Sequence, residues 1–307
     1  MSATVPEMVA AGAIPARASE ARWVTDVLLL LMAVIWGVNF SVLKYGTQFV
    51  APLAFNGLRV PIAAATQLGI AGALRLEKVS RQVAIRLVLL GMLGNGVYQC
   101  LFILGIVRSR VVTAALIIAA TPAFVAVLGR MLGTEKLTRK HWIGIVLQIA
   151  GCSTVVMGSA RGVNGEDSLL GGALLLGAAL SWAIYSVMLR SYIAHAHPLQ
   201  MGGYTMLGGA LVTGIVAVPA LAATSWTTLP AGVWLAVFYS SLVAMVLAYL
   251  FWYRGLRVLG PTRVAVYSNL QPLFAAVVAY VALHEVPTGT QAVGAAFVVS
   301  GLLMNRN

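Results

Sequence analysis

Charged residues are scarce in this chain, and acidic residues are the scarcest of them. Only 9% of the 307 residues are charged, with 8 Asp and Glu against 20 Lys and Arg. Soluble domains carry about a quarter charged and about half apolar residues, whereas 60% of this chain is hydrophobic. The composition excludes an ordinary soluble domain and predicts an all-α polytopic membrane protein.

Several kinds of chemical site are missing as well. The two cysteines, Cys100 and Cys152, both fall in apolar segments, so we expect neither a disulfide nor a metal site. The sequence has no nucleophile beside a base, no phosphate-binding loop after a strand and no His/Cys cluster. We therefore expect no enzyme activity and no cofactor.

Basic residues outnumber acidic ones, which could indicate a nucleic-acid partner. In a chain this apolar, the excess is more simply explained by basic loops on the cytoplasmic side of a bilayer. The expected partners are therefore membrane lipid and a small-molecule substrate, and not a nucleic acid.

Hydropathy predicts about ten transmembrane helices joined by short connections. Their approximate ranges are 27–46, 52–74, 84–105, 111–132, 141–159, 169–190, 199–221, 231–253, 262–283 and 288–304. Residues 1–26 lack the pattern of a cleaved signal and are expected to form a cytoplasmic tail. With that tail inside, fifteen Lys and Arg fall on the inner side and four on the outer side. The positive-inside rule then predicts that both termini are cytoplasmic.

The second half of the chain repeats the first at a nearly constant offset. Four pairs of residues lie 150 positions apart, namely Pro122 and Pro272, Glu135 and Glu285, Gly144 and Gly294, and Gly151 and Gly301. Earlier in each half the offset is 146, as it is for Trp36 and Trp182. We therefore expect two repeats, at 27–160 and 161–307.

Each predicted repeat holds five helices, an odd number, so the second repeat enters the membrane from the opposite side. Two halves with one fold and opposite orientation can exchange an outward opening for an inward one around a midplane site. Membrane enzymes and scaffolds have no particular need for this symmetry. The pattern favours alternating-access transport through a central cavity.

The candidate binding residues are polar or aromatic side chains at mid-depth. Because such groups are costly against lipid, they should face a cavity or another helix. The full set expected to bind substrate is Trp36, Asn39, Asn95, Tyr98, Gln99, Thr121, Trp182, Tyr185, Tyr249, Asn269 and Gln271. Asn95, Tyr98 and Gln99 are spaced i, i+3 and i+4, so they are expected to share one helical face, and Trp252 lies three residues beyond Tyr249. Any single Asn or Gln could equally hold two helices together.

Pro122 and Pro272 lie near the middle of the fourth and ninth predicted helices. Each removes one backbone donor and frees the carbonyl four residues earlier, on Ile118 and Ser268. We expect both prolines to act as hinges, and the alternative is a kink that neighbouring helices tolerate.

Arg59 is the one basic residue embedded in a predicted span. It could attract a substrate carboxylate, or as a structural residue it could bind helix-end carbonyls or snorkel toward the membrane surface. None of the acidic residues falls at mid-membrane, so the sequence offers no carboxylate relay for ion coupling. We expect Glu135 and Glu285 to cap helix connections or to pair with basic residues nearby.

These residues together resemble the drug/metabolite transporter superfamily, in its EamA-type ten-helix branch. The resemblance covers residues 27 to 305 and rests on the five-helix duplication together with Trp36-Gly37, Asn39-Phe40, Leu58-Arg59, Thr121-Pro122 followed by Glu135, and Pro272 followed by Glu285. It implies that helices one to four and six to nine surround a cavity, with five and ten at the periphery. The chain looks most similar to the aromatic amino acid exporters (the YddG type). Thr205 stands where the second repeat would need a counterpart of Arg59.

The resulting expectation is a transporter of the bacterial inner membrane that exports amino acids, aromatic and neutral ones first, by facilitated transport. Two alternatives stay open at this point. One is an exporter of nucleobases, nucleosides or other small metabolites through the same pocket. The other is a nontransporting membrane receptor or assembly subunit, which leaves the inverted repeat unexplained.

Overall fold

The structure, a computed structural model, describes residues 16–133, 138–159, 168–193, 195–260, 264 and 267–305. Every regular element in these ranges is a helix. The α-helices are α1 (Ala16–Gly46), α2 (Pro52–Ala73), α3 (Arg81–Gly91), α4 (Tyr98–Ile106), α5 (Val111–Ile118), α6 (Thr121–Met131), α7 (Arg139–Ser159), α8 (Leu169–Leu189), α9 (Pro198–Ala222), α10 (Ala231–Phe238), α11 (Ala248–Val258), α13 (Gln271–Leu283) and α14 (Gly289–Asn305). Two π-helical segments, η1 (Met92–Val97) and η4 (Tyr239–Leu247), and two short 3-10 turns, η2 (Arg190–Tyr192) and η3 (Trp226–Thr228), complete them.

Ten crossing segments result, because some of them consist of two or three elements in line. The third is α3, η1 and α4, the fourth is α5 and α6, the eighth is α10, η4 and α11, and α13 ends the ninth. Six described helices are long and apolar enough to cross a bilayer by length and composition. The predicted fold class, an all-α protein of ten helices in two inverted repeats, is confirmed. Helix α1 begins at Ala16, so part of the expected tail is helical, and residues 1–15 lie outside the described residues.

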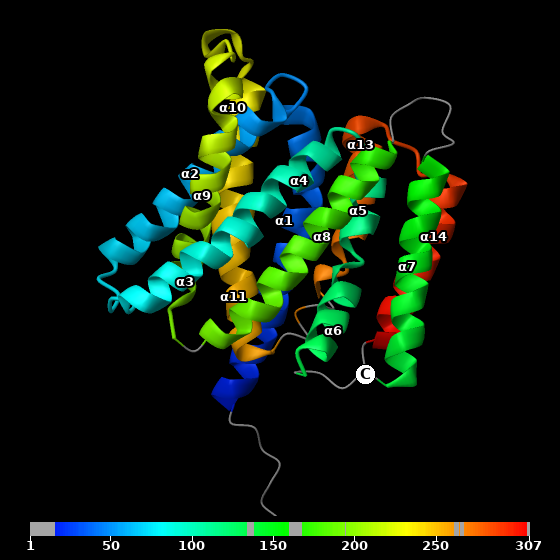
Figure 1. Cartoon of the computed structure of the whole chain (residues 1–307), viewed down its shortest axis with the longest axis horizontal. Helices are drawn as coiled ribbons and strands as arrows, with labels where there is room; N and C mark the ends of the chain where they lie inside the picture. Colours follow the sequence, from blue (N-terminus) through cyan, green and yellow to red (C-terminus); the bar gives the residue numbers. More distant parts are fainter. Residues whose placement is uncertain are drawn as a thin grey trace, which may run out of the picture.

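Helices pack across the two halves in matched pairs. Helix α2 lies along α9, its counterpart in the second repeat, and α7 lies along α14 (Figure 1). Helix α1 packs against α13, and α8 packs against α6. Because α8 is the counterpart of α1 and α6 is the counterpart of α13, the second contact repeats the first with the two halves exchanged. The repeated sequence thus builds a repeated set of helix contacts around a shared centre.

Both halves break a helix at the same place. In the first, α5 stops at Ile118 and α6 starts at Thr121; in the second, α13 starts at Gln271 after an equivalent turn. The turn hydrogen bonds match, with the Ala120 amide donating to the Ile117 carbonyl at 3.1 Å and the Leu270 amide donating to the Tyr267 carbonyl at 3.0 Å. The repeat therefore reproduces even the irregular backbone.

Pro122 and Pro272 begin the helices that follow these breaks, where a proline removes no helical hydrogen bond. The carbonyl that Pro122 was expected to free, on Ile118, accepts a hydrogen bond of 2.6 Å from the Thr121 hydroxyl. The break is therefore stabilised locally, and the hinge role of the two prolines stays a prediction.

The third and eighth crossing segments each contain a π-helical stretch, which the sequence pattern does not indicate. Such stretches release backbone carbonyls from the helical ladder. In η4 the Ala244 carbonyl accepts from Trp36 Nε1 at 2.9 Å, and the Met245 carbonyl accepts from Gln67 Nε2 at 2.7 Å. The irregular segment thereby ties α1 and α2 of the first half to the second half.

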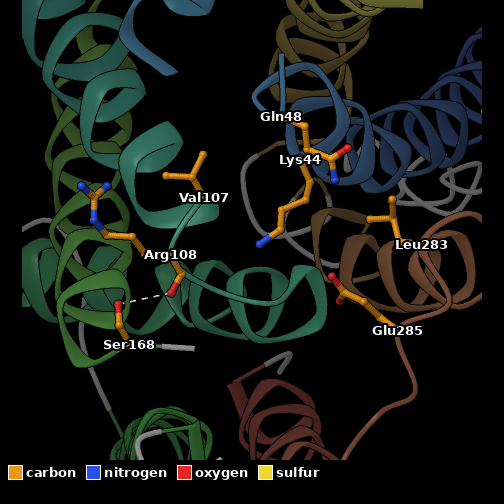
Figure 2. Close-up of a pocket in the computed structure, with 7 residues that line it drawn as sticks. All are labelled: Lys44, Gln48, Val107, Arg108, Ser168, Leu283 and Glu285. Atoms are coloured by element: carbon orange, nitrogen blue, oxygen red, sulfur yellow. Dashed lines mark hydrogen bonds between the residues drawn. The ribbon is translucent and has the colours of Figure 1, made fainter. Parts of the chain in front are cut away.

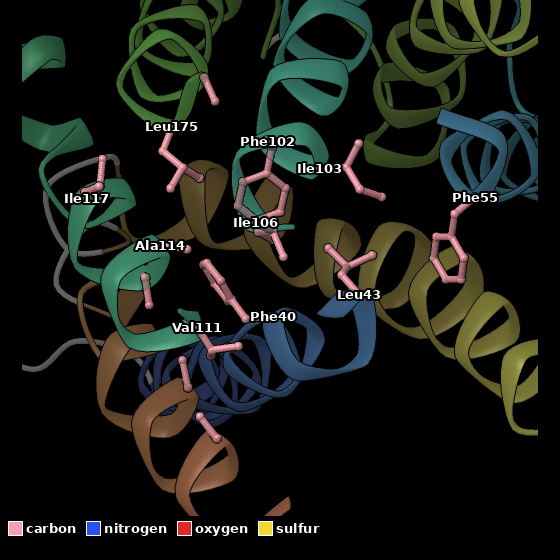
Figure 3. Packing of buried hydrophobic residues seen from close by; sticks show 14 of the residues in the cluster. Phe40, Leu43, Phe55, Phe102, Ile103, Ile106, Val111, Ala114, Ile117 and Leu175 are labelled. Carbon is pink, nitrogen blue, oxygen red and sulfur yellow. The ribbon is translucent and has the colours of Figure 1, made fainter. Parts of the chain in front are cut away.

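An apolar core fills the end of the bundle where α1 finishes, here called the Gly46 end; the opposite end is the Ala16 end. Phe40, Phe102, Ile106 and Val111 meet there from α1, α4 and α5 (Figure 3). The Phe40 and Phe102 rings lie edge to face with centroids 5.3 Å apart. This core closes the space between the two halves at the Gly46 end.

Helices α7 and α14 pack closely through glycines, as expected. A Cβ added at Gly151 would lie 2.7 Å from the Gly294 carbonyl oxygen, and one added at Gly301 would collide with the Gly144 carbonyl oxygen. The absence of side chains at these positions lets the two backbones approach. The pair stands beside the rest of the bundle, as Figure 1 shows.

Candidate functional site

A cavity of about 1070 Å³ lies between the two halves. Its walls come from α1, α2, α4, α5, α6, α7, α8, η2, η4, α11, α13 and α14. The lining reaches the Ala16 end at His141, Arg190 and Leu256, and one side follows α14 from Gln291 to Leu303. The cavity thus opens from mid-depth toward the Ala16 end, and along the start of α14, at Pro287 and Gln291, its lining also reaches the Gly46 end beside the apolar core.

Five aromatic rings form a continuous wall at the middle of this cavity. Trp36 lies 5.5 Å from Tyr249, Trp182 lies 5.1 Å from Tyr98, and Trp182 lies 5.4 Å from Trp252, measured between ring centroids. Such rings prefer edge-to-face and offset contacts with one another and with a bound aromatic group. The wall therefore offers apolar ring faces to a ligand.

Neutral hydrogen-bonding groups complete the lining. The Asn39 Oδ1 accepts from the Ser240 hydroxyl at 2.9 Å, which leaves the Asn39 amide nitrogen able to donate elsewhere. Thr121, Asn269 and Gln271 line the cavity at the two helix breaks. Among the described residues that form the lining, none is Asp or Glu.

The structure brings most of the expected binding residues together. Nine of them line the cavity, together with both prolines, namely Trp36, Asn39, Tyr98, Gln99, Thr121, Trp182, Tyr249, Asn269 and Gln271. Two do not: Asn95 and Tyr185 lie behind the wall and are fully buried against protein. Whether the nine contact a substrate stays a prediction.

Asn95 and Tyr185 belong to a hydrogen-bonded layer that supports the wall. The Asn95 Oδ1 accepts from the Tyr249 hydroxyl at 3.1 Å, and the Tyr185 and Tyr253 hydroxyls lie 2.9 Å apart. Asn95 lies within η1, where π-helical geometry breaks the i, i+3, i+4 spacing that was expected to place it beside Tyr98. Asn95 and Tyr185 therefore support the ring wall from behind and do not line the cavity.

Arg59 also lines the cavity, although the expected binding set omits it. Its side chain is 1% exposed, with Nε donating to Asn56 Oδ1 at 2.7 Å and Nη2 donating to Gln99 Oε1 at 2.5 Å. Arg59 therefore binds two side-chain amide oxygens, and not the helix-end carbonyls that a structural role was expected to use. Trp252 was omitted too, and its position three residues after Tyr249 was the available signal.

A smaller pocket of about 480 Å³, the Lys44 pocket, lies at the Gly46 end (Figure 2). Lys44 Nζ donates to the Ser109 carbonyl at 2.6 Å, and Glu285 Oε2 accepts from the Val111 amide at 2.9 Å. The second contact confirms that Glu285 caps a helix, the start of α5, whereas Glu135 lies outside the described residues. The Glu285 contact joins the two halves at the Gly46 end, whereas the Lys44 contact joins α1 to the turn between α4 and α5 within the first half.

Comparison with known proteins identifies the family to which this architecture belongs. The sequence profile of the EamA-like transporter family matches residues 23–157 and again residues 169–306. The chain belongs to the EamA-like transporter family. It is therefore a multi-pass membrane transporter and not an enzyme. This excludes the nontransporting receptor or assembly subunit.

Curated relatives span nearly the whole chain. One from Salmonella typhimurium, named "Probable amino-acid metabolite efflux pump", is 29% identical over 91% of this chain and 93% of its own length. One from Bacillus subtilis, named "Uncharacterized transporter YyaM", is 27% identical over 90% and 92%. One from Streptantibioticus cattleyicolor, named "Probable terminal-alkyne amino-acid exporter", is 25% identical over 94% of each chain.

A solved crystal structure shares the fold of this EamA-like transporter. It superimposes with a TM-score of 0.65 at 20% sequence identity, over 94% of this chain and 97% of the other. At that identity the likeness concerns the arrangement of helices alone.

Proposed function

We propose that this EamA-like transporter exports amino acids, aromatic and neutral ones first, by alternating access across a bacterial inner membrane. In this proposal both termini are cytoplasmic, and 27–160 and 161–307 form the two repeats after a tail at 1–26. The halves exchange openings by bending at Pro122 and Pro272. Two relatives with amino-acid efflux or export in their names support the substrate class.

The wall of aromatic rings carries the proposal. Trp36, Tyr98, Trp182, Tyr249 and Trp252 present ring faces inside a cavity whose volume lies near the upper end of ordinary ligand sites, about 300–1,000 Å³. An aromatic or apolar side chain fits such a wall, and the neutral amides and hydroxyls beside it suit the polar end of an amino acid. The expected binding set, less Asn95 and Tyr185, becomes the proposed binding set.

The lining also supports transport without a coupled ion. Proton- and cation-coupled carriers commonly place a carboxylate in the transport path, where it can change its charge. The described lining residues include no Asp or Glu. Cargo therefore moves down its own gradient in this proposal.

Flux through purified protein in liposomes tests both parts. We expect labelled phenylalanine, tyrosine, tryptophan and leucine to leave loaded vesicles faster than from protein-free vesicles, and nucleosides to compete poorly. No flux of any amino acid, or stronger competition by nucleosides, contradicts the substrate class. Uphill phenylalanine movement driven by an imposed pH gradient contradicts facilitated transport.

A further inference from the structure

Arg59 is a buried cation whose protein partners are all neutral. Its two side-chain hydrogen bonds go to the amide oxygens of Asn56 and Gln99, and in the described part of the chain it forms no ion pair with Asp or Glu. A charge inside a membrane protein is costly unless it is paired, and such residues mark substrate pathways. A counter-charge supplied by the cargo would satisfy it.

The guanidinium is held ready for such a ligand. Asn56 Nδ2 donates to the Gln99 backbone carbonyl at 2.6 Å, which turns its Oδ1 toward Arg59 Nε. The two amide oxygens use the Nε and one Nη2 donor, and an arginine carries five N–H donors in a planar fork. The remaining donors suit the two oxygens of a carboxylate.

The other charged side chain in the described lining is basic as well. Arg190 lines the cavity toward the Ala16 end, and no acidic side chain is among the described lining residues. A cargo carboxylate therefore meets a charged partner at Arg59. A cargo ammonium meets ring faces, such as those of Trp36 and Trp182, and neutral oxygens.

We propose that Arg59 binds the carboxylate of the cargo, and that this transporter recognises a monocarboxylate with an aromatic or apolar body whether or not it carries an ammonium. This inference rests on the proposed amino-acid export and extends it to aromatic 2-oxo acids and N-acylated amino acids. The carboxylate docks between the Arg59 fork and the ring wall. Compounds with a blocked carboxylate, such as amides, lose their anchor.

The inference also gives facilitated export a driving force. A cargo of charge −1 is pushed outward by an inside-negative potential, and 100 mV changes its equilibrium ratio about fiftyfold. A zwitterion gains nothing from the same potential. Facilitated transport can then export an anion against its concentration gradient without a coupled ion, because the anion still moves down its electrochemical gradient.

Competition in liposomes containing the full chain tests the inference without any variant. Against labelled phenylalanine efflux we expect phenylalanine, phenylpyruvate and N-acetylphenylalanine to compete with similar strength, and phenylalaninamide at least about tenfold more weakly. Equal competition by the amide overturns the inference and leaves amino-acid export intact. Absence of phenylalanine flux, with labelled phenylpyruvate still transported, overturns the proposed amino-acid export and the indifference to the ammonium, and leaves only the Arg59–carboxylate contact supported.

Variants assign the effect to Arg59. We expect Arg59→Gln to weaken phenylpyruvate binding, measured by quenching of tryptophan fluorescence, at least about tenfold, and Arg59→Lys to weaken it less. The control is Arg86→Gln, because Arg86 lies exposed on α3; this variant should retain wild-type affinity. If Arg59→Gln elutes as a folded monodisperse protein and still separates acid from amide, the inference is wrong. If Arg59→Gln does not fold, Arg59→Lys decides: weaker phenylpyruvate binding with unchanged phenylalaninamide binding supports the inference, and unchanged phenylpyruvate binding overturns it.

Discussion

Trp36 and Trp182 occupy equivalent positions in the two repeats, and their rings meet edge to face across the cavity. The centroids are 6.5 Å apart and the planes are inclined at 87°. The two residues lie 146 positions apart in the chain, so duplication and inversion have brought one residue type into contact with its own copy. The contact lies at the centre of the ring wall and marks the depth at which cargo is expected to bind.

Replacement of Trp182 by Ala should weaken binding of aromatic cargo about tenfold or more. Trp182 contacts Tyr98, Tyr249 and Trp252, and aromatic pairs contribute about 0.5–1.5 kcal/mol each beyond buried area. Titration of purified protein with tryptophan and with leucine measures the change, which should be larger for tryptophan.

The matched control is Trp234→Ala, because Trp234 lies 45% exposed on α10, outside the cavity, against Trp226. It should bind both ligands as wild type does. Unchanged tryptophan affinity in Trp182→Ala would remove the ring wall from the binding site.

Replacing Pro122 or Pro272 by Ala should slow transport while leaving equilibrium binding within about threefold of wild type. Alanine restores the backbone donor and allows the interrupted helix to continue across the break, which stiffens the proposed hinge. Single-vesicle efflux rates and ligand titration measure the two quantities separately.

Pro219→Ala provides the comparison, since Pro219 lies inside α9 and away from the cavity lining. Transport by this variant should stay at the wild-type rate. Wild-type efflux by the Pro122→Ala, Pro272→Ala double variant would mean that the breaks do not move during transport.

Gly151→Ala should destabilise the protein by about 1–3 kcal/mol, because its Cβ would press on the backbone carbonyl of Gly294 at 2.7 Å. Gly214→Ala in α9 meets nothing within 4 Å and should be neutral or stabilising by about 0.5–1 kcal/mol. Thermal unfolding in detergent compares the two. Equal midpoints would show that α7 and α14 separate without consequence.

His197 should make stability depend on pH at the start of α9. Its Nδ1 accepts from the Leu199 amide at 3.3 Å, and burial together with nearby Arg257 lowers the pKa of His197 below its usual value. A lowered folded-state pKa means that this contribution is present above the unfolded pKa, about 6.5, and is lost as the pH falls below it.

The variant His197→Asn retains a capping oxygen that does not titrate in this range. Thermal midpoints at pH 7.5 and pH 5 should therefore fall less for His197→Asn than for wild type. Contributions that the two proteins share cancel in the comparison. An identical fall in both would exclude His197 as the titrating cap.

Sequence reasoning reached the fold because its signals are repeated or summed over many residues. Apolar runs predicted the spans, and the odd number of spans per repeat predicted inversion. The glycine pairs at 144/294 and 151/301 predicted the α7–α14 packing for a local reason: a missing side chain permits close approach whatever surrounds it.

The sequence by itself determined the membrane class, the duplication, the absence of acidic residues at mid-depth and nine residues of the cavity lining. Only the tertiary structure decided which face of each helix turns inward. The π segment at Met92–Val97 rotates Asn95 out of its expected row, and the approach of α2 to α4 brings Arg59 onto Gln99. Periodicity is a property of one helix, whereas a side chain's partners depend on how distant helices pack, and that information is not local in the sequence.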